Sequence, residues 1–443
     1  MTTGPADAPA GPPNRSWTDL AGWLVLAAAG LAVTALAVHV GAKLGTASAP
    51  FLGRYRLQAT PLSLLAPLVA AGVLAAGSAG WLERLRWGPL VLVGWLAGLA
   101  WALALAVTDG AGGLTRSLSD PTTYGSDVAA VDDHPMHYLA TYVRDAQTHS
   151  FAARGHPPGA VLLLWALGRL GVHSQLAQGI LLTALGTLTI PAVLYCVADV
   201  CGRATARLYL PVLVLAPYAV WVSVSVDGVE AALGAVAVVA GVRASGHGRR
   251  GWAAAGWSIA CGVLLGIAGM VGYAVVWLGL SVVLLYFARR RPFLNVGTGI
   301  GAVIVVVVVN AMGFDWLAGL AAARSDFTTR IEPHRSALWW SLISLATLIL
   351  ACGPALYASA RKIRNTPAWP FLVGSAIAVL FSVVAGLERG GAEAAWLPFF
   401  PWLTVAAVAP ESQGGDPPPA PWPLVVGGAV TALVIEALLA TPW

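Results

Sequence analysis

Charged residues are scarce in this sequence. Only 10% of the 443 residues are Asp, Glu, Lys or Arg, whereas soluble domains carry about 25%. So few charges cannot cover the surface of a water-soluble protein, which excludes that class. Cysteine is rare too, and Cys196, Cys201, Cys261 and Cys352 lack metal-ligand spacing, so we expect small buried residues. No basic tract or aromatic stacking platform indicates nucleic-acid binding, and no internal repeat is present.

Long apolar runs make up most of the sequence, and 58% of the residues are hydrophobic. Runs of about 20 apolar residues are typical of helices that span a membrane. The sequence therefore predicts an all-α, polytopic transmembrane helical bundle. Fourteen runs lie near residues 20–40, 61–80, 88–108, 158–172, 176–198, 208–226, 228–243, 252–269, 271–288, 293–312, 336–360, 368–386, 395–410 and 421–441.

Basic residues in short loops predict the orientation of these runs, because such loops favour the cytoplasm. They lie at Arg84/Arg86, Arg203/Arg207, Arg243/Arg249/Arg250, Arg289/Arg290/Arg291 and Arg361/Lys362/Arg364. All of these loops lie on one side of the membrane only if the run 158–172 does not cross it. That run is 15 residues long, or about 22 Å, against a hydrocarbon core of about 30 Å. We therefore predict thirteen crossings, although loop 41–60 then lies outside with Lys43, Arg54 and Arg56.

The predicted organisation has three parts. Residues 1–16 are rich in Pro, Ala and Gly and are expected to be a disordered tail. Residues 17–410 form the transmembrane domain, in which 109–157 is a large extracytoplasmic loop between the third and fourth membrane helices. Residues 411–443 are a Pro-rich linker and a last apolar helix.

The segment 120–159 holds an unusual share of the titratable groups in this apolar chain. Among its acids, Asp127, Asp132 and Asp133 are the candidate catalytic residues. A carboxylate at a membrane surface can act as a general base on an acceptor hydroxyl, or bind a divalent cation. The alternatives are a solvated turn for Asp127, and an N-cap of the helix predicted to follow for Asp132 or Asp133.

Further polar residues fall in loops that the predicted topology brings to the same face. Arg154 and His156 precede the short helix, in RGHPPG. Arginines in 313–335 could clamp a phosphate bidentately, the alternative being ion pairs with neighbouring acids. For Asp227, N-capping is an equally good alternative. The candidate substrate-binding residues are Arg154, His156, Asp227, Tyr273, Arg324, Arg330, Arg335 and Glu393.

Several of these segments, in order, carry a resemblance to a known family. They are YGSDV, DDHPMHYLATYVRD and RGHPPGAVLLLWAL, then LAPYAVWVSVSVDGVEAAL, GFDWLAGLAAARSDF and GLERGGAEAAWLPFFPWL. The HPPG segment after an acidic outer loop resembles bacterial relatives of protein mannosyltransferases. From about residue 85 the chain is similar to actinobacterial integral membrane proteins with the GT-C glycosyltransferase fold. Relatives often carry an acid followed by arginine in the last outer loop, whereas GAEAAW keeps Glu393 without that arginine.

The resemblance implies a glycosyltransferase that takes a mannose-like or other sugar from a polyprenyl-phosphate donor at the extracytoplasmic face of the cell membrane. The acceptor would be a glycan, lipid or protein of the cell envelope. It implies Asp127 as the base or metal-binding acid, with Asp132 and Asp133 as rivals. A divalent cation is the one candidate cofactor. A transporter or flippase of lipid-linked substrates, or a non-catalytic envelope assembly protein, are the alternatives.

Overall fold

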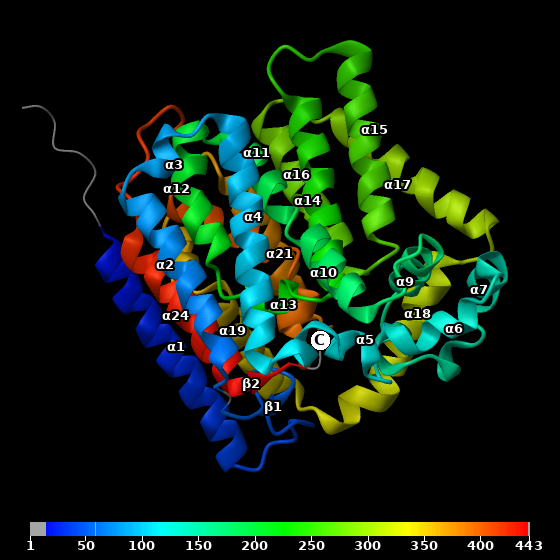
Figure 1. Ribbon diagram of the computed structural model, residues 1–443. Coiled ribbons are helices and arrows are strands. Elements are labelled where there is room, and N and C mark those ends of the chain that lie inside the picture. Colours follow the sequence, from blue (N-terminus) through cyan, green and yellow to red (C-terminus); the bar gives the residue numbers. More distant parts are fainter. Residues whose placement is uncertain (1–14, 58, 442–443) are drawn as a thin grey trace, which may run out of the picture.

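The computed structural model describes residues 15–57 and 59–441, and this part of the chain is built almost entirely of helices (Figure 1). The longer helices are α1 (Ser16–His39), α2 (Leu65–Ser78), α4 (Trp87–Ala106), α9 (Gly159–Arg169), α10 (Gln175–Gly186), α11 (Thr189–Val200), α12 (Arg203–Val214), α14 (Val226–Ser245), α15 (Gly251–Ala268), α16 (Gly279–Ala288), α17 (Leu294–Ala311), α18 (Trp316–Asp326), α19 (Ala337–Cys352), α21 (Trp369–Val384) and α24 (Trp422–Leu438). The predicted all-α class is confirmed.

Short helices connect or extend these. They are α3 (Trp81–Arg84), α5 (Arg116–Ser119), α6 (Val128–Val131), α7 (Pro135–Thr141), α8 (Phe151–Arg154), α13 (Ala219–Val222), α20 (Ala355–Arg361), α22 (Ala392–Ala395) and α23 (Phe400–Thr404). Single turns include η4 (Tyr124–Asp127), η6 (Ala274–Leu278), the π-helical turn η7 (Phe327–Ile331) and η8 (Glu332–His334). The strands β1 (Arg54–Tyr55) and β2 (Leu439–Ala440) pair antiparallel, with Arg54 opposite Ala440.

The helices fit a multi-pass membrane protein. Among the described residues, seven helices are long and apolar enough to cross a bilayer, or eight if the bent pair Trp316–His334 and Ala337–Cys352 is one span. Four shorter apolar helices, α9, η6 with α16, α21 and α24, add to them. The count of thirteen crossings stays a prediction, because the shorter helices and the broken pair do not settle it by length.

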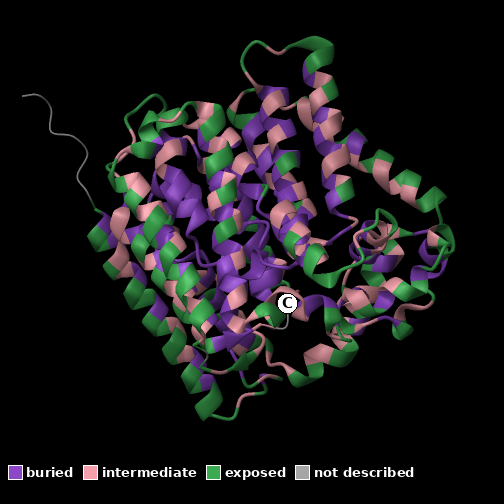
Figure 2. Ribbon diagram, viewed as in Figure 1, coloured by how far each residue is buried: buried purple, intermediate pink, exposed green. Residues whose placement is uncertain are grey.

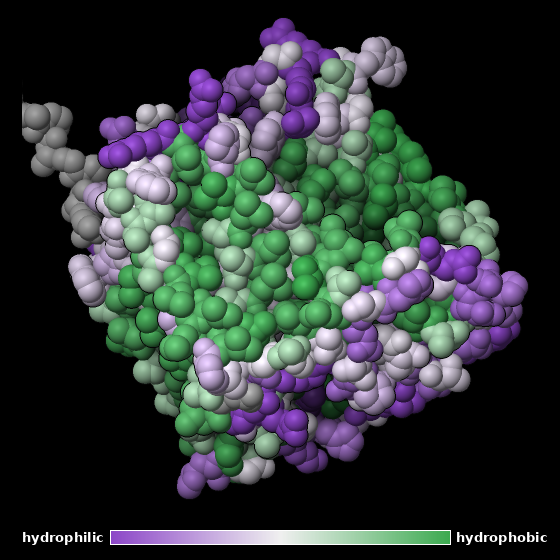
Figure 3. Space-filling model, in the orientation of Figure 1, coloured by the Kyte–Doolittle hydropathy of each residue, from purple (hydrophilic) through white to green (hydrophobic). Residues whose placement is uncertain are grey.

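On the face that Figure 3 shows, a broad apolar band lies between two polar ends. The basic face is the end that holds the α2–α4, α11–α12, α14–α15 and α16–α17 connections, at the top of Figure 1. The acidic face is the opposite end, where loops 40–60, 107–158, 312–336 and 385–392 meet. The grouping of the basic loops on one face agrees with the pattern that predicted the orientation.

Burial differs strongly among the helices. Over an 18-residue stretch, 78% of α14 is buried, whereas only 6% of α17 is buried. The helix α14 is therefore central, and α17 lies at the edge of the molecule (Figure 2). Small residues allow α17 to approach α15 closely. A Cβ atom at Gly262 would lie 1.9 Å from the carbonyl oxygen of Thr298, so a larger residue would force the helices apart.

The run 158–172 forms α9, which has only 11 residues. Its N-terminal end follows the acidic-face segment, and Arg169 at its C-terminal end pairs with Asp133 of the same segment. The next helix, α10, also starts at this face, where Gly179 lies against the carbonyl of Leu114. Both ends of α9 therefore lie on the acidic face, as expected of a short or re-entrant helix.

Loop 41–60, which carries basic residues on the otherwise acidic face, is fastened by ion pairing and strand pairing. Arg56 and Arg116 both pair with the buried Asp109 at the end of α4. The backbone N–H of Arg56 donates to Leu438 O at 2.8 Å, next to the β1–β2 pair. The positive charge of Arg56 is thus offset locally, which removes the conflict that the charge pattern raised at this residue.

The predicted domain limits can be compared with the structure only in part. Residues 1–14, most of the predicted disordered tail, lie outside the described residues, and α1 begins at Ser16. The segment 411–421 is non-helical and leads into α24. The limits themselves stay predictions.

Candidate active site on the acidic face

Asp127 lies at the end of η4 in a closed network. Its carboxylate oxygens accept the backbone N–H of Ser150 at 3.1 and 3.2 Å, and Nδ1 of His149 lies 3.4 Å from Oδ1. The His149 ring stacks on Tyr142 with centroids 4.4 Å apart. Burial acts to raise the pKa of Asp127, but the hydrogen bonds from His149 and Ser150 outweigh it and lower the pKa. Asp127 is therefore an ionised, buried support for the segment that leads into α8.

Replacing Asp127 with alanine is expected to destabilise this segment. The substitution leaves the Ser150 N–H and the His149 ring without an acceptor, which costs about 1–3 kcal/mol of unfolding free energy. Thermal unfolding of the detergent-solubilised protein measures it. The matched control is Asp145→Ala, which removes an exposed ion pair with Arg144 and should lower the melting temperature less than Asp127→Ala does. Equal melting temperatures for the two variants would contradict a supporting role for Asp127.

Asp132 and Asp133 lie apart from this network, on an exposed rim. Their side chains are 77% and 67% exposed. Asp132 approaches His134, while Asp133 pairs with Arg169. The backbone of Asp132 has φ +46°, and its carbonyl accepts from the Trp165 indole N–H at 2.7 Å. Neither aspartate caps the next helix, since His134 is the N-cap residue of α7, so that alternative is wrong.

Arg154 and Arg330 are brought together by an acid. The Nε atoms of Arg154 and Arg330 lie 3.6 and 2.9 Å from Oδ1 of the buried Asp326. Arg330 also donates to Gln147, in the loop before α8. Arg330, a predicted phosphate ligand, and Arg154, a predicted substrate-binding residue, are therefore neutralised at least in part, and they join η7 to the segment 142–154.

The other two predicted arginines meet a third, from the last loop of the acidic face. Arg324 Nη2 and Arg389 Nη2 lie 3.0 and 3.2 Å from Oε1 of Glu332. Arg389 Nη1 donates to Arg335 O at 3.1 Å, and Arg335 donates back to Arg389 O. Arg324, Arg335 and Arg389 thus form an arginine group in which two guanidinium groups share the Glu332 carboxylate and the third, of Arg335, is joined to Arg389 through backbone carbonyls. Such a group has positive charge left for an anion. Arg389 stands in this group although no arginine follows Glu393.

His156 and Asp227 interact electrostatically. Nδ1 of His156 lies 2.8 Å from the Ala152 carbonyl and donates to it, since a carbonyl oxygen can only accept. The Tyr124 ring meets the His156 ring edge-on at 5.5 Å. Asp227 does not cap α14, because Ser225 is the N-cap and accepts from the Asp227 N–H. The half-buried Asp227 carboxylate accepts from Ser225 Oγ at 3.3 Å through Oδ2, while Oδ1 has no hydrogen-bond partner among the described residues.

Three glutamates complete a buried acidic group around Asp227. Glu230, on the same helix face, interacts with Asp227 and Glu388, and its Oε1 accepts the Val275 N–H at 3.2 Å. Burial, and then the charge of Glu393, raise the pKa of Glu388 to about 8, against the attraction of Arg335. Glu388 is therefore protonated in most molecules at neutral pH.

Glu393 is fully buried at the N-terminus of α22. Its Oε1 accepts the backbone N–H of Leu52 at 2.7 Å, which ties loop 40–60 to the site. Burial raises its pKa to about 7, while the Leu52 hydrogen bond and Arg335 act to lower it. Burial likewise lowers the pKa of Arg335, and the charges of Glu388 and Glu393 oppose that shift. The arginine group and the acidic group are therefore electrostatically coupled.

Tyr273, another predicted substrate-binding residue, lies beside α18. Its ring meets Trp316 edge-on at 5.2 Å, and its buried hydroxyl has no hydrogen-bond partner within the described residues. It interacts electrostatically with Tyr142, which places it nearer to the Asp127 network than to the arginine group.

The predicted residues thus fall into separate groups. The structure unites His156, Asp227, Arg324, Arg335 and Glu393, to which it adds Tyr124, Glu230, Glu332, Glu388 and Arg389. Of the added residues, Glu230 had a signal in the sequence, since it lies three residues after Asp227 and so shares its helix face. Glu332 was covered by the predicted alternative of ion pairs between the 313–335 arginines and neighbouring acids, since Arg324 lies eight residues before it. Tyr124 had no such signal, because Asp227 and Glu230 lie far from it in the sequence.

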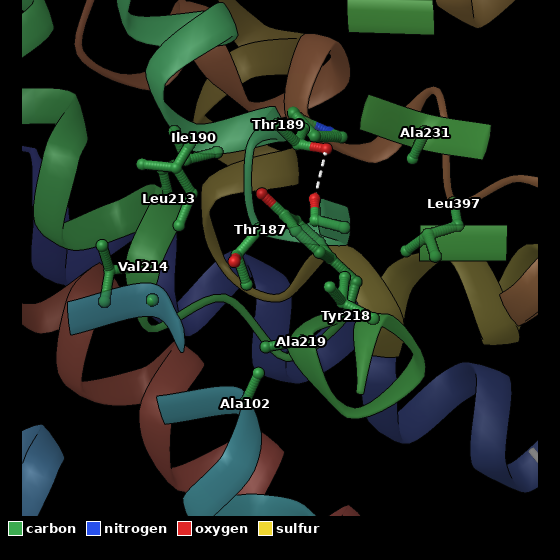
Figure 4. Close-up of a pocket in the computed structure, with 14 residues that line it drawn as sticks. Ala102, Thr187, Thr189, Ile190, Leu213, Val214, Tyr218, Ala219, Ala231 and Leu397 are labelled. Carbon is green, nitrogen blue, oxygen red and sulfur yellow. Dashed lines mark hydrogen bonds between the residues drawn. The ribbon is translucent and has the colours of Figure 1, made fainter. Parts of the chain in front are cut away.

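Beneath the acidic group lies an apolar cavity between α4, α10, α12 and α14 (Figure 4). It reaches Ala231, next to Glu230, and it is lined by small and aliphatic side chains and by Thr187, Thr189 and Tyr218. The Thr189 hydroxyl is already satisfied by Gly186 O at 2.8 Å. A wider apolar groove of about 250 Å³ between α2, α4 and α12 shares Val214 with the cavity. The cavity and the groove are thus neighbours across Val214, and the groove is bordered by α2.

The sequence matches no protein-family model and no curated protein. Its fold was compared with solved structures, and two are similar. One is the crystal structure of ArnT from Cupriavidus metallidurans in the apo state, at 18% identity and a TM-score of 0.45, covering 71% of this chain and 59% of that one. The other is the same protein bound to undecaprenyl phosphate, at 17% identity and a TM-score of 0.44, covering 75% and 60%. This chain therefore spans about three fifths of the length of those structures.

Among the residues that the structure describes, no three or more His, Cys, Asp and Glu side chains are arranged to hold a metal ion. The divalent cation stays a prediction from the resemblance. The chemistry that the described side chains can supply is proton transfer and anion binding.

Proposed function

We propose that this protein is a glycosyltransferase of the GT-C type. It would move a mannose-like or other sugar from a polyprenyl-phosphate donor to a cell-envelope acceptor at the extracytoplasmic face. The observation that carries the proposal is that Asp227 interacts electrostatically with His156 and with Glu388, which in turn interacts with Arg324 and Arg335 of the arginine group. The sequence resemblance to GT-C enzymes of the actinobacterial type supports it.

The arginine group would hold the donor phosphate. Arg324 has a side chain 41% exposed, against 16% for Arg389. It pairs with Glu332, donates to Gly386 O at 3.4 Å and lies over the Phe327 ring. Guanidinium groups match phosphate oxygens bidentately and would offset the charge that builds on the departing polyprenyl phosphate. A protonated Glu388 would donate a hydrogen bond to the same phosphate, where an ionised carboxylate would repel it.

Asp227 would act as the general base. In the transfer, the acceptor oxygen forms a bond to the anomeric carbon, the bond from that carbon to the phosphate oxygen breaks, and Asp227 takes the hydroxyl proton. Asp127 suits this role less, because both its oxygens are occupied and it is 6% exposed. Asp132 and Asp133, open on the rim, would meet the acceptor rather than the donor.

The experiment that tests the function follows sugar release. The purified protein is mixed with polyprenyl-phosphate-linked radiolabelled mannose in detergent or vesicles, with an envelope extract as acceptor. Appearance of label in the acceptor, together with free polyprenyl phosphate, supports a transferase. Movement of the intact lipid-linked sugar across vesicles without cleavage would instead identify a flippase, and neither result would favour a non-catalytic protein.

Replacing Arg324 with glutamine is expected to weaken donor use. Loss of one charge-assisted contact to the phosphate should raise KM for the donor about 10- to 100-fold, with a smaller change in kcat. The matched control is Arg330→Gln, because Arg330 is engaged by Asp326 and Gln147. Initial rates at varied donor concentration measure both. A larger KM effect for Arg330 than for Arg324 would place the phosphate elsewhere.

A further inference from the structure

We propose that the basic face carries a second binding site, for the phosphate headgroup of an anionic phospholipid. It is formed by the α14–α15 and α16–α17 loops, far from the acidic-face site, and it does not depend on the proposed function. The arginine platform is the set of arginines in these loops: Arg243, Arg249, Arg250, Arg289, Arg290 and Arg291. Figure 1 shows the α14–α15 loop at the outer limit of the basic face.

The two loops are fastened to each other by the arginines themselves. Arg291 Nη1 donates to Arg249 O at 2.6 Å, and Arg289 Nη1 donates to Val242 O at 3.1 Å. The Arg243 guanidinium lies between two rings, with the Tyr195 centroid at 5.1 Å and the Trp257 centroid at 4.9 Å. A ligand would therefore meet a preorganised set of positive groups rather than a mobile loop.

The positive charge of the platform is largely uncompensated. Within the described residues, the one carboxylate paired with these six arginines is Asp199, which binds Arg289. Arg250 and Arg290 are exposed and have no carboxylate partner in that part of the chain. Arg290 also has φ +55°, a left-handed conformation that is strained for a residue other than glycine. The loop thus presents a free guanidinium at its tip despite an unfavourable backbone.

Exposed aromatic residues border the arginine platform and point to a lipid rather than a soluble anion. Trp252 is 93% exposed and Phe293 is 87% exposed, and each begins or precedes an apolar helix. Aromatic side chains at the ends of membrane helices lie at the headgroup level, where they stabilise insertion. Arginines beside them reach lipid phosphates at the same depth, as basic pockets between membrane helices do.

Binding of phosphatidylglycerol and phosphatidylcholine to the purified full chain, counted by native mass spectrometry, tests the site. The variant Arg250→Gln/Arg290→Asn removes two charges, and asparagine tolerates the left-handed backbone. We expect a Kd for phosphatidylglycerol about tenfold higher, with phosphatidylcholine binding and the melting temperature unchanged. The control Arg84→Gln/Arg86→Gln removes two exposed charges of the same face outside the platform and should change Kd less than twofold.

Two outcomes would overturn the proposal. An equal loss in the control variant would show that general surface charge attracts the lipid. Full competition by millimolar inorganic phosphate, together with no effect of Trp252→Ala/Phe293→Ala, would show a soluble-anion site instead. If the double arginine variant does not fold, Arg250→Gln alone leaves the α16–α17 loop intact and should raise Kd about threefold.

Discussion

Replacing Asp227 with asparagine should abolish most of the sugar transfer, lowering kcat by about 10²–10⁴. Asparagine keeps the shape of the side chain but cannot take the proton of the acceptor hydroxyl. The Ser225 cap, which accepts from the backbone N–H of residue 227, would persist, so α14 should remain intact. Donor KM should change little, because the phosphate contacts lie in the arginine group. Single-turnover transfer at saturating donor measures the loss.

The comparison variants make the Asp227 assignment specific. Asp120→Asn alters an exposed acid of the same face, held by Thr122, and should leave transfer unchanged. Asp132→Asn and Asp133→Asn should affect acceptor KM more than kcat, because both lie on the exposed rim. A full-rate Asp227→Asn enzyme, beside an inactive Asp127→Asn enzyme of normal melting temperature, would return the role of base to Asp127.

Donor binding should weaken as pH rises through about 8, the raised pKa of Glu388. Below that value the carboxyl is protonated and can donate to the phosphate. Above it the carboxylate is ionised, stands beside the bound phosphate and repels it. Donor KM should therefore rise about tenfold per pH unit above 8, as expected for a group that must be protonated. Donor titrations from pH 6 to 10 measure this rise in KM.

Glu388→Gln separates this group from the others. Glutamine donates a hydrogen bond at every pH. The variant should therefore bind donor at pH 7 as the wild type does, and its donor KM should not rise above pH 8; this rise is the alkaline limb of the wild-type profile. A matched variant is Glu411→Gln, which changes an exposed acid of the loop before α24 and should keep the limb. An unchanged pH profile in Glu388→Gln would exclude Glu388 from the phosphate site. A limb moved to lower pH would point to Glu393, whose pKa is about 7.

Particular residues show where prediction from the sequence succeeded. The arginine loops predicted one basic face, and the run 158–172 predicted a short or re-entrant helix, whose two ends lie on the acidic face. Both follow from local composition and length, since charge asymmetry and the span of a helix need no partner. The meeting of His156 with Asp227 and of Arg324 with Arg335 was predicted as a shared face, without contacts.

The contacts of other residues could be determined only from the tertiary structure. Arg330 was predicted to bind phosphate and Arg154 to bind substrate, but both pair with Asp326. Asp127 had the motif context of a catalytic acid, yet it accepts from Ser150 in a closed network. From the sequence alone, an ionisable side chain that pairs with a distant residue of the chain cannot be distinguished from one that binds a substrate.

The sequence by itself determined a helical membrane protein and the segments that share its polar faces, because these depend on apolar run length and on the sign of loop charges. The tertiary structure alone decided which charges are satisfied internally and which remain for a ligand. It closed the network around Asp127 and left Asp227, Glu388 and the arginine group together at the centre of the acidic face. The physical reason is that the cost of burying a charge is offset only by partners within a few ångströms, and here loops from distant parts of the chain supply them.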